Sequence, residues 1–390
     1  MSFEALTPTA FLKRSATVFG DRIAVIDGDK KFTYTQFYER TQKLAGALRA
    51  LGVNNGERAA VLAPNSHVLL EAHYGVPFAG GVLVALNQRL TANELAYAIR
   101  HSEARVLIYD DELGAVADAI ARDIGPSLKL IRAGGADEYE AWLASAAPHT
   151  EPVADERGLL SINYTSGTTG KPKGVMYHHR GAYLQALAMS AHLRLDCSSV
   201  YLWTLPMFHC NGWCFTWGVT AAGATHLCLR KLDPELIWQH LRASGVTHFC
   251  AAPTVLIMIA WAEAAQFGRL AESVHAATGG APPTPAILMR MAELGITHDQ
   301  LEAALKGFSA NTSGGFLELN GREYLIRNLG RTSRLDDLKN LALTASKGQP
   351  ILLRQIAEVT FAAAIKRGDA GFEGKPAVIL GIQKIGRAHV

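Results

Sequence analysis

At the centre of the sequence stands the stretch Tyr164-Thr165-Ser166-Gly167-Thr168-Thr169-Gly170-Lys171-Pro172-Lys173-Gly174-Val175. Its glycines at 167, 170 and 174 allow positive φ angles, so that backbone N–H groups can approach an anion closely. Hydroxyl groups and two lysine ammonium groups add further hydrogen-bond donors. The run before it, residues 159–164, is apolar enough to predict a strand. The stretch therefore predicts a phosphate-binding loop that follows a strand.

A Walker-type P-loop also combines glycines with a lysine after a strand, but it does not fit here. That motif needs glycine where Thr165 stands, and it needs Ser or Thr where Pro172 follows Lys171. Proline also lacks the N–H that a helix start directs at phosphate. The stretch instead resembles the signature loop of the AMP-forming adenylating enzymes, a family that includes the acyl-CoA synthetases. A flexible Gly/Ser/Thr linker is the alternative, but linkers do not usually place Lys-Pro-Lys-Gly after a strand.

Bulk composition indicates a soluble globular protein. The chain has 390 residues, of which 49% are apolar and 19% charged, and about two or three domains are expected at this length. A net charge of +3 favours neither a nucleic-acid partner nor an anionic membrane. The N-terminus lacks a basic region followed by an apolar core, and no apolar run reaches the roughly 18 residues of a membrane span. We therefore expect a cytoplasmic protein without a membrane span, and the oligomeric state stays open.

The five cysteines, at 197, 210, 214, 228 and 250, predict reduced thiols rather than a disulfide framework. His209, Cys210 and Cys214 raise the alternative of a zinc site. A fourth ligand is not evident, and the apolar neighbours Trp213 and Phe215 favour buried cysteines. We therefore expect no protein-held metal.

Between residues 22 and 278, short apolar runs alternate with segments of helical period. Strands are expected at Ile23–Ile26, Ala59–Leu62, Val82–Leu86, Val106–Tyr109, Leu159–Tyr164, Val200–Leu205, Ala224–Leu229, Val246–Cys250 and Val274–Ala277. A helix is expected at Thr35–Leu51, where apolar side chains share one face. Such alternation predicts an α/β fold with layered, mostly parallel sheets and helices. The family resemblance covers residues 1–298 and implies the large N-terminal domain of an adenylate-forming enzyme, truncated, followed by a small α+β C-terminal segment.

A second informative segment is Leu205-Pro206-Met207-Phe208-His209-Cys210-Asn211-Gly212-Trp213. It is similar to the family segment in which a histidine stands at the entrance of the acyl pocket. Phe208 and Trp213 would supply apolar contact area, and His209 would orient or sense the substrate carboxylate. An isolated histidine is more often a packed core residue, but the surrounding motif favours the acid-facing role. If a helix starts here, residues 209 and 213 share a face.

A third segment, Ala277-Thr278-Gly279-Gly280-Ala281-Pro282-Pro283, follows an expected strand. By itself it is only a turn signal. In the resembled family such a turn lies against the adenine, where glycines remove side chains from the path of a flat base. The resemblance therefore implies adenine contacts at Gly279, Gly280, Ala281 and Pro282.

After residue 298 the resemblance to the adenylating family ends. The family continues with a Tyr-Gly-x-Thr-Glu loop that supplies the magnesium-associated glutamate, and later with a ribose-binding Asp and a C-terminal lysine, and none of these motifs is found. Every Met, Trp and Cys of the chain precedes residue 299. The tail predicts strands at Arg322–Arg327, Pro350–Leu353 and Ala377–Leu380, with a helix at Arg334–Leu343, as a small βαβ-containing unit.

The tail resembles a different family. Asn311 to Leu319, Leu335-Asp336-Asp337-Leu338 and Leu353 to Val359 look like part of the periplasmic porter region of heavy-metal RND efflux pumps, and the resemblance spans residues 300–384. Residues 385–390 look like a translated sequencing adapter. These observations predict a fusion joined between about residues 292 and 300, with segments 1–298, 299–384 and an artefactual 385–390. An efflux-pump component is a further alternative that rests on this tail alone.

The first resemblance implies ATP-dependent activation of a fatty or aryl carboxylic acid to acyl-AMP and then acyl-CoA, with ATP, Mg²⁺ and coenzyme A as cofactors. It implies that His209 and Lys173 act in catalysis. The residues implied for the phosphates are Thr165, Ser166, Gly167, Thr168, Thr169, Gly170 and Lys171. Because the C-terminal motifs are missing, we expect the activity to be impaired and the CoA site to be absent. A non-catalytic chimeric protein that at most binds nucleotide is the alternative.

Overall fold

The computed structural model describes residues 4–134, 138–165, 172–279 and 283–297, and six strands between 312 and 377. The chain divides into two compact units, Met1–Ala303 and Ala304–Val390. Each unit is described by itself. In the part of the chain that is described, no helix has the length and apolar character needed to cross a membrane.

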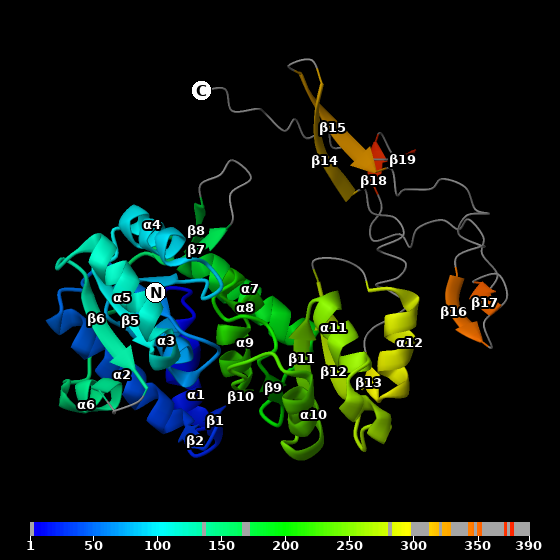
Figure 1. The fold of residues 1–390 in the computed structure, drawn as a ribbon, viewed down its shortest axis with the longest axis horizontal. Coiled ribbons are helices and arrows are strands. Elements are labelled where there is room, and N and C mark those ends of the chain that lie inside the picture. The colour runs from blue at the N-terminus through cyan, green and yellow to red at the C-terminus, as the bar shows by residue number, and fades with distance from the viewer. Residues whose placement is uncertain are drawn as a thin grey trace. The chain divides into compact units, whose positions relative to one another are not determined.

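The first unit contains a seven-stranded sheet of order β13-β12-β11-β9-β10-β1-β2 (Figure 1). All neighbouring strands are parallel except β1 and β2, which form an antiparallel hairpin. The strands are β1 (Ile23–Asp27), β2 (Lys30–Thr33), β9 (Val200–Leu202), β10 (Thr225–Leu227), β11 (His248–Ala251), β12 (Val274–Thr278) and β13 (Ile296–Thr297).

A second sheet in the same unit has six strands in the order β6-β5-β3-β4-β7-β8. It is parallel from β6 to β7, and only the edge pair β7–β8 is antiparallel. The strands are β3 (Arg58–Leu62), β4 (Val82–Ala85), β5 (Val106–Asp110), β6 (Lys129–Ala133), β7 (Leu159–Thr165) and β8 (Lys173–His178). The two mostly parallel sheets confirm the predicted α/β class.

Helices cover and join the sheets. They are α1 (Thr9–Val18), α2 (Tyr34–Ala50), α3 (His67–Phe78), α4 (Ala92–Ser102), α5 (Gly114–Ile124), α6 (Glu138–Ser145), α7 (His179–His192), α8 (Cys210–Trp213), α9 (Phe215–Ala222), α10 (Pro234–Ala243), α11 (Pro253–Ala260) and α12 (Pro285–Glu293), with 3-10 turns at Asp111–Leu113 and Glu263–Phe267. Every residue of α3 is buried, because this helix contacts β1 of one sheet and β3 and β4 of the other. A mostly apolar helix belongs in such an interior position, and its few polar side chains then need buried partners.

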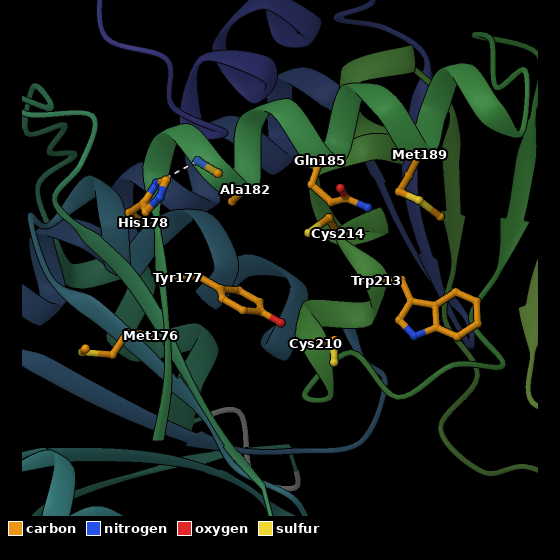
Figure 2. Close-up of a pocket in the computed structure, with 10 residues that line it drawn as sticks. Met176, Tyr177, His178, Ala182, Gln185, Met189, Cys210, Trp213 and Cys214 are labelled. Atoms are coloured by element: carbon orange, nitrogen blue, oxygen red, sulfur yellow. Dashed lines mark hydrogen bonds between the residues drawn. The ribbon is translucent and has the colours of Figure 1, made fainter. Parts of the chain in front are cut away.

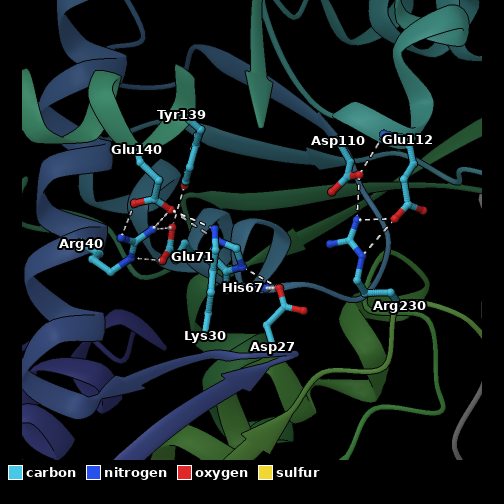
Figure 3. A network of polar contacts seen from close by, with 10 residues as sticks. All are labelled: Asp27, Lys30, Arg40, His67, Glu71, Asp110, Glu112, Tyr139, Glu140 and Arg230. Atoms are coloured by element: carbon cyan, nitrogen blue, oxygen red, sulfur yellow. Dashed lines mark hydrogen bonds and ion pairs between the residues drawn. The ribbon is translucent and has the colours of Figure 1, made fainter. Parts of the chain in front are cut away.

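A buried polar network fastens α2, α3 and α6 beneath this core (Figure 3). The Arg40 guanidinium donates to both carboxylate oxygens of Glu71, at 2.5 and 3.3 Å, and to Glu140 at 2.7 Å. Glu71 is fully buried and also accepts a hydrogen bond of 2.7 Å from the Tyr139 hydroxyl. The buried charges are thus paired, as a low-dielectric interior requires.

The predicted strands all exist in the first unit, but four further strands, β2, β6, β8 and the two-residue β13, were missed. β2 and β8 are antiparallel partners of predicted strands, and both are largely exposed, so neither shows the apolar alternation of a half-buried strand. β6 is an edge strand of mixed polarity. The predicted helix at 35–51 corresponds to α2, whose first turn is closed by a capping box between Thr33 and Gln36.

The described strands of the second unit form three two-stranded antiparallel sheets. They pair β14 (Thr312–Leu319) with β15 (Arg322–Asn328), β16 (Ala342–Ser346) with β17 (Gln349–Leu352), and β18 (Ala370–Phe372) with β19 (Lys375–Ala377). The expected strands at 322–327 and 350–353 are found as β15 and β17. The βαβ expectation is wrong for them, because each pairs with its sequence neighbour through a short connection, and residues 342 and 343 of the expected helix lie in β16. The rest of that helix and residues 378–380 lie outside the described residues.

Candidate functional site

The predicted phosphate loop connects the two strands of the β7–β8 hairpin. Thr165, the last residue of β7, lies directly opposite Lys173, the first residue of β8, and both residues are exposed. The predicted phosphate contacts Ser166, Gly167, Thr168, Thr169, Gly170 and Lys171 lie outside the described residues. The hairpin therefore brings together the hydroxyl and the ammonium group that flank the loop, at the exposed edge of the second sheet.

Gly174 does not have the positive φ expected from the sequence. It is a regular residue of β8 opposite Tyr164, and it is absent from the glycines with positive φ. A Cβ at this position would lie 2.9 Å from Cγ2 of Ile162. Glycine is needed here because two large side chains of β7 occupy the space beside it.

The segment that leads to His209 is held by a buried asparagine of the β3–α3 connection. The side-chain amide of Asn65 donates to the carbonyl oxygens of Trp203 and Leu205 at 2.8 and 2.7 Å. Its carbonyl oxygen accepts from the backbone N–H of Met207 at 2.8 Å. These three bonds clamp the chain after β9, and His209 follows the clamp as an exposed residue.

The segment after His209 is a left-handed turn. Residues 210 to 214 have φ angles of 49°, 41°, 57°, 55° and 63°, and Gly212 is the single glycine among them. A left-handed turn costs roughly 1–2 kcal/mol for each non-glycine residue. α8 is therefore not the ordinary helix on which residues 209 and 213 would share a face, and the surrounding fold must hold it in place.

An apolar cavity of about 480 Å³ opens beside this turn (Figure 2). Figure 2 shows α7 along one side of it, the side chain of Tyr177 from β8 on a second, and the turn on a third. Its lining is Met176, Tyr177, His178, Gly181, Ala182, Gln185, Met189, Cys210, Trp213 and Cys214. The volume lies within the usual range for small-molecule sites, and the lining is mainly hydrophobic with few polar groups, as such sites require.

One side-chain contact shifts the pKa values of His209 and Cys210 at the start of the turn. The interaction of the His209 and Cys210 side chains raises the pKa of His209 and lowers the pKa of Cys210. Burial raises the pKa of the neighbouring Cys214 to about 12. The pKa shift of His209 therefore comes mainly from its hydrogen bond to the Cys210 thiol.

The predicted adenine turn begins beside Trp213 of the left-handed turn. Gly279 packs on the indole of Trp213, because a Cβ at 279 would lie 2.5 Å from its Cη2 atom. Next to it, the hydroxyl of Thr278 is buried and has no hydrogen-bond partner among the described residues. Gly280, Ala281 and Pro282 lie outside the described residues. The structure thus brings the first residue of the adenine turn to the cavity wall.

No cluster of three His, Cys, Asp or Glu side chains that could hold a metal exists in the described ranges. The zinc alternative at His209, Cys210 and Cys214 therefore has no complete donor set there, and all five cysteines are free thiols. The described residues also offer no carboxylate set for magnesium, so no step is assigned to that ion.

Sequence reasoning missed the residues that hold the site together. Asn211, in the middle of the left-handed turn, is fully buried and accepts hydrogen bonds from Ser161 and Asn163 of β7. One signal for this was available. Ser161 and Asn163 are two polar residues with the spacing of one strand face inside an otherwise apolar strand, and buried polar side chains need partners.

Comparison with known proteins gives two family matches. The AMP-binding enzyme family matches residues 12–304, and the AcrB/AcrD/AcrF family matches residues 286–389. The second match confirms the resemblance of the tail to that class of transporter. The two matched ranges overlap at 286–304.

Curated relatives of the chain are CoA ligases. An acetate–CoA ligase of Humulus lupulus is 37% identical over 372 residues, covering 89% of this chain and 63% of the ligase. A peroxisomal benzoate–CoA ligase of Arabidopsis thaliana is 37% identical over 368 residues, covering 89% of this chain and 61% of the ligase. The chain therefore spans less than two thirds of the length of these relatives.

A solved structure shows the same fold. The N-terminal domain of FACL13 from Mycobacterium tuberculosis superposes with a TM-score of 0.68 at 27% identity, covering 75% of this chain and 74% of that one. The matched part has the layered sheets described above. Its fold, its signature segments and its relatives agree, and the chain belongs to the AMP-binding enzyme family over residues 12–304.

Proposed function

We propose that this chain derives from an enzyme that activates a fatty or aryl carboxylic acid with ATP, first to acyl-AMP and then to acyl-CoA. One observation carries the proposal. A mainly apolar cavity, an exposed histidine and the hairpin of the predicted phosphate loop are built from one set of elements, namely β7, β8, α7 and the turn after His209. The family membership and the CoA-ligase relatives support the reaction class.

Each predicted site residue has a role in this proposal. His209 faces the acid carboxylate, and Lys173 contributes a positive charge at the base of the hairpin. Thr165 and the loop residues 166–171 surround the phosphates of ATP, and residues 279–282 contact the adenine. Attack of the carboxylate oxygen on the α-phosphorus of ATP, with pyrophosphate as the leaving group, requires such neutralisation of phosphate charge. Mg²⁺ would accompany the phosphates of ATP, and coenzyme A would accept the acyl group.

The cavity supports an apolar acid. Methionine, alanine, tryptophan and cysteine side chains form most of its wall, so a polar acid would lose hydration without gaining partners. Its volume of about 480 Å³ accommodates a medium-length acyl chain or an aryl ring. The acetate and benzoate named for the relatives are both small monocarboxylic acids.

Acid-dependent exchange of labelled pyrophosphate into ATP tests the proposal. Octanoate and benzoate are the probe acids, and the wild-type chain is compared with Lys173→Ala. The matched control is Lys13→Ala, which removes another exposed lysine, on α1. Exchange that depends on acid and is abolished only in Lys173→Ala supports the proposal. An absence of exchange at every acid concentration contradicts a working ligase.

A non-catalytic chimeric protein remains the second candidate, because the match to the AcrB/AcrD/AcrF family begins at residue 286. In this proposal residues 1–298 are an AMP-binding segment, 299–384 a porter-type segment and 385–390 an artefactual tail. Amplifying the source DNA across the codons for residues 292–300 tests it, since a continuous native product would rule out a fusion. A cytoplasmic location is the corresponding proposal for the ligase, and cell fractionation tests it.

A further inference from the structure

The side chain of Asn211 ties the left-handed turn beside the cavity to strand β7 of the second sheet. Its carbonyl oxygen accepts a hydrogen bond of 2.9 Å from the Ser161 hydroxyl and one of 2.5 Å from the Asn163 amide. Its own amide donates to Nε2 of His73 on α3 at 2.9 Å. Asn211, Ser161 and His73 are each 0% exposed and Asn163 is 5% exposed, so water cannot replace these bonds.

The hydrogen-bond network assigns the state of His73. Nδ1 lies 2.7 Å from the carbonyl oxygen of Leu69, which can only accept, so Nδ1 carries the proton. Nε2 must then be the unprotonated nitrogen that accepts from Asn211. Burial lowers the pKa of His73 to about 4, which keeps this neutral tautomer near pH 7. The nearby His226 is also neutral, because burial lowers its pKa to about 3.

The same strand that binds Asn211 carries the predicted phosphate loop. Ser161 and Asn163 lie in β7, and two residues after Asn163 the strand ends at Thr165. Asn211 lies two residues after His209 and next to Cys210 of the cavity wall. One buried amide therefore links the acid-facing turn to the strand that leads into the phosphate loop.

Asparagine suits this position for two reasons. Its side chain supplies one acceptor for two donors and one donor for an acceptor, which is what β7 and α3 present. Among residues other than glycine, it also tolerates the left-handed conformation well. The backbone carbonyl of Asn211 receives a further bond, of 3.1 Å, from the Thr216 hydroxyl at the start of α9.

We propose that Asn211 is a positioning residue that anchors the left-handed turn to β7 and so sets the distance between the acid side and the phosphate side of the site. The anchoring itself stands on the described contacts, and its consequence for the reaction rests on the function proposed above. Ser161 and Asn163 donate the hydrogen bonds that hold the Asn211 carbonyl oxygen, and neutral His73 orients its amide by accepting from it.

The alkylation rates of two buried thiols test the anchoring by Asn211 independently of enzyme activity. Cys214 ends the turn, and Cys250 lies in β11 of the other sheet. Burial raises the pKa of each thiol to about 12, so both should react slowly with iodoacetamide. Cys214 is 6% exposed and lines the cavity, so its rate should rise when the turn is released, whereas Cys250 is 0% exposed and should react only when its sheet opens. We expect Ser161→Ala and Asn211→Ala to raise alkylation of Cys214 about tenfold, corresponding to about 1.4 kcal/mol, with Cys250 unchanged. Ser15→Ala is the matched control, since Ser15 is equally buried and its hydroxyl donates to the Thr220 carbonyl oxygen, away from the turn.

A conservative variant supplies a second readout. Asn211→Asp keeps the acceptor for β7 but replaces the donor to His73 by a carboxylate oxygen. His73 should then bind a second proton, so its pKa, followed by NMR, should rise from about 4 to above its usual value of about 6.5. In an active chain, pyrophosphate exchange by Asn211→Asp should approach the wild-type rate at low pH and fall as pH rises through the new pKa.

The outcomes separate the anchor from the function. If wild-type protein shows no exchange, the function proposal fails, and Cys214 labelling with the His73 titration still decides the anchor. If wild-type protein is active, Ser161→Ala should lower kcat/KM for both octanoate and ATP. Unchanged Cys214 labelling in Ser161→Ala and Asn211→Ala would overturn the proposal, and so would faster labelling in an active chain with unchanged kcat/KM for both substrates.

Discussion

A methyl group added at residue 279 would collide with the indole that forms part of the cavity wall. A Cβ built on Gly279 lies 2.5 Å from Cη2 and 2.9 Å from Cζ2 of Trp213. An ordinary carbon contact of about 3.5 Å therefore requires the ring or the strand end to move by about 1 Å. Gly279 is not among the residues with positive φ, so its backbone accepts alanine and the effect of Gly279→Ala is steric. Overpacking of this kind costs about 1–3 kcal/mol.

The expected result is a loss of acid binding together with a loss of stability. A displacement of about 1 Å at a substrate-positioning wall lowers kcat/KM for octanoate by about tenfold to a hundredfold. The melting temperature falls by roughly 2–4 °C per kcal/mol. Gly114→Ala is the control, because a Cβ at Gly114 has no atom within 4 Å, and alanine there should be neutral or slightly stabilising.

Titration of intrinsic tryptophan fluorescence with octanoate measures acid binding directly, and thermal melting measures stability. The adenine expectation makes a different prediction, since a side chain in the path of the base would weaken ATP binding alone. Gly279→Ala with unchanged acid affinity and unchanged melting temperature, relative to Gly114→Ala, would refute the packing of Gly279 on Trp213.

Three further perturbations test other parts of the fold. Arg40→Met leaves the buried carboxylate of Glu71 without its ion-pair partner and should lower the unfolding free energy by about 3–5 kcal/mol. Arg100→Met breaks an exposed ion pair and should lower it by under about 1 kcal/mol. Urea denaturation of both variants measures the difference. The pKa of His73 is lowered to about 4 by burial, so its contribution, on the order of 3 kcal/mol, is complete above about pH 6.5 and is lost as pH falls through 4. Burial opposes protonation of His67, but its hydrogen bond to Asp27 and its contact with Glu140 raise its pKa to about 9. Its contribution to the unfolding free energy is therefore complete below about pH 6.5 and is lost as pH rises through 9. An unfolding free energy that is constant from pH 4 to 9 would contradict the assignments of both His73 and His67.

The sequence predicted the fold where periodicity is local. β3, β4, β5 and β7 are buried runs of apolar residues, and each was expected within one or two residues of its observed ends. β8 was not predicted, because this exposed edge strand of sequence Lys-Gly-Val-Met-Tyr-His has no apolar face. Its pairing with β7 is a tertiary fact that the periodicity of residues 173–178 does not encode.

The candidate site likewise contains residues that the sequence motifs indicated and one residue that only the tertiary structure reveals. Motif resemblance pointed to Thr165, Lys173, His209 and Gly279, and the structure places the first two opposite each other and Gly279 against Trp213 of the turn that follows His209. Motif resemblance did not point to Asn211. Its hydrogen-bond partner on α3 is 138 residues away in the sequence, and its partners on β7 are 48 and 50 residues away. No spacing rule reaches across two sheets, so such contacts are visible only in three dimensions.

The left-handed turn explains why wall and anchor should respond differently to substitution. Cys210 and Cys214 line the cavity, so under the proposed function their volumes would set which acid fits, and exchanging them for serine or alanine removes none of the side-chain bonds of Asn211. Asn211 is not among the residues that line the cavity, yet residues 210 to 214 hold an unfavourable conformation that its three side-chain bonds stabilise. Cys210→Ala should therefore alter the ratio of octanoate to benzoate activation with little change in melting temperature. Asn211→Ala should weaken the binding of octanoate and benzoate to a similar extent and lower the melting temperature, because it releases the turn rather than changing the cavity wall.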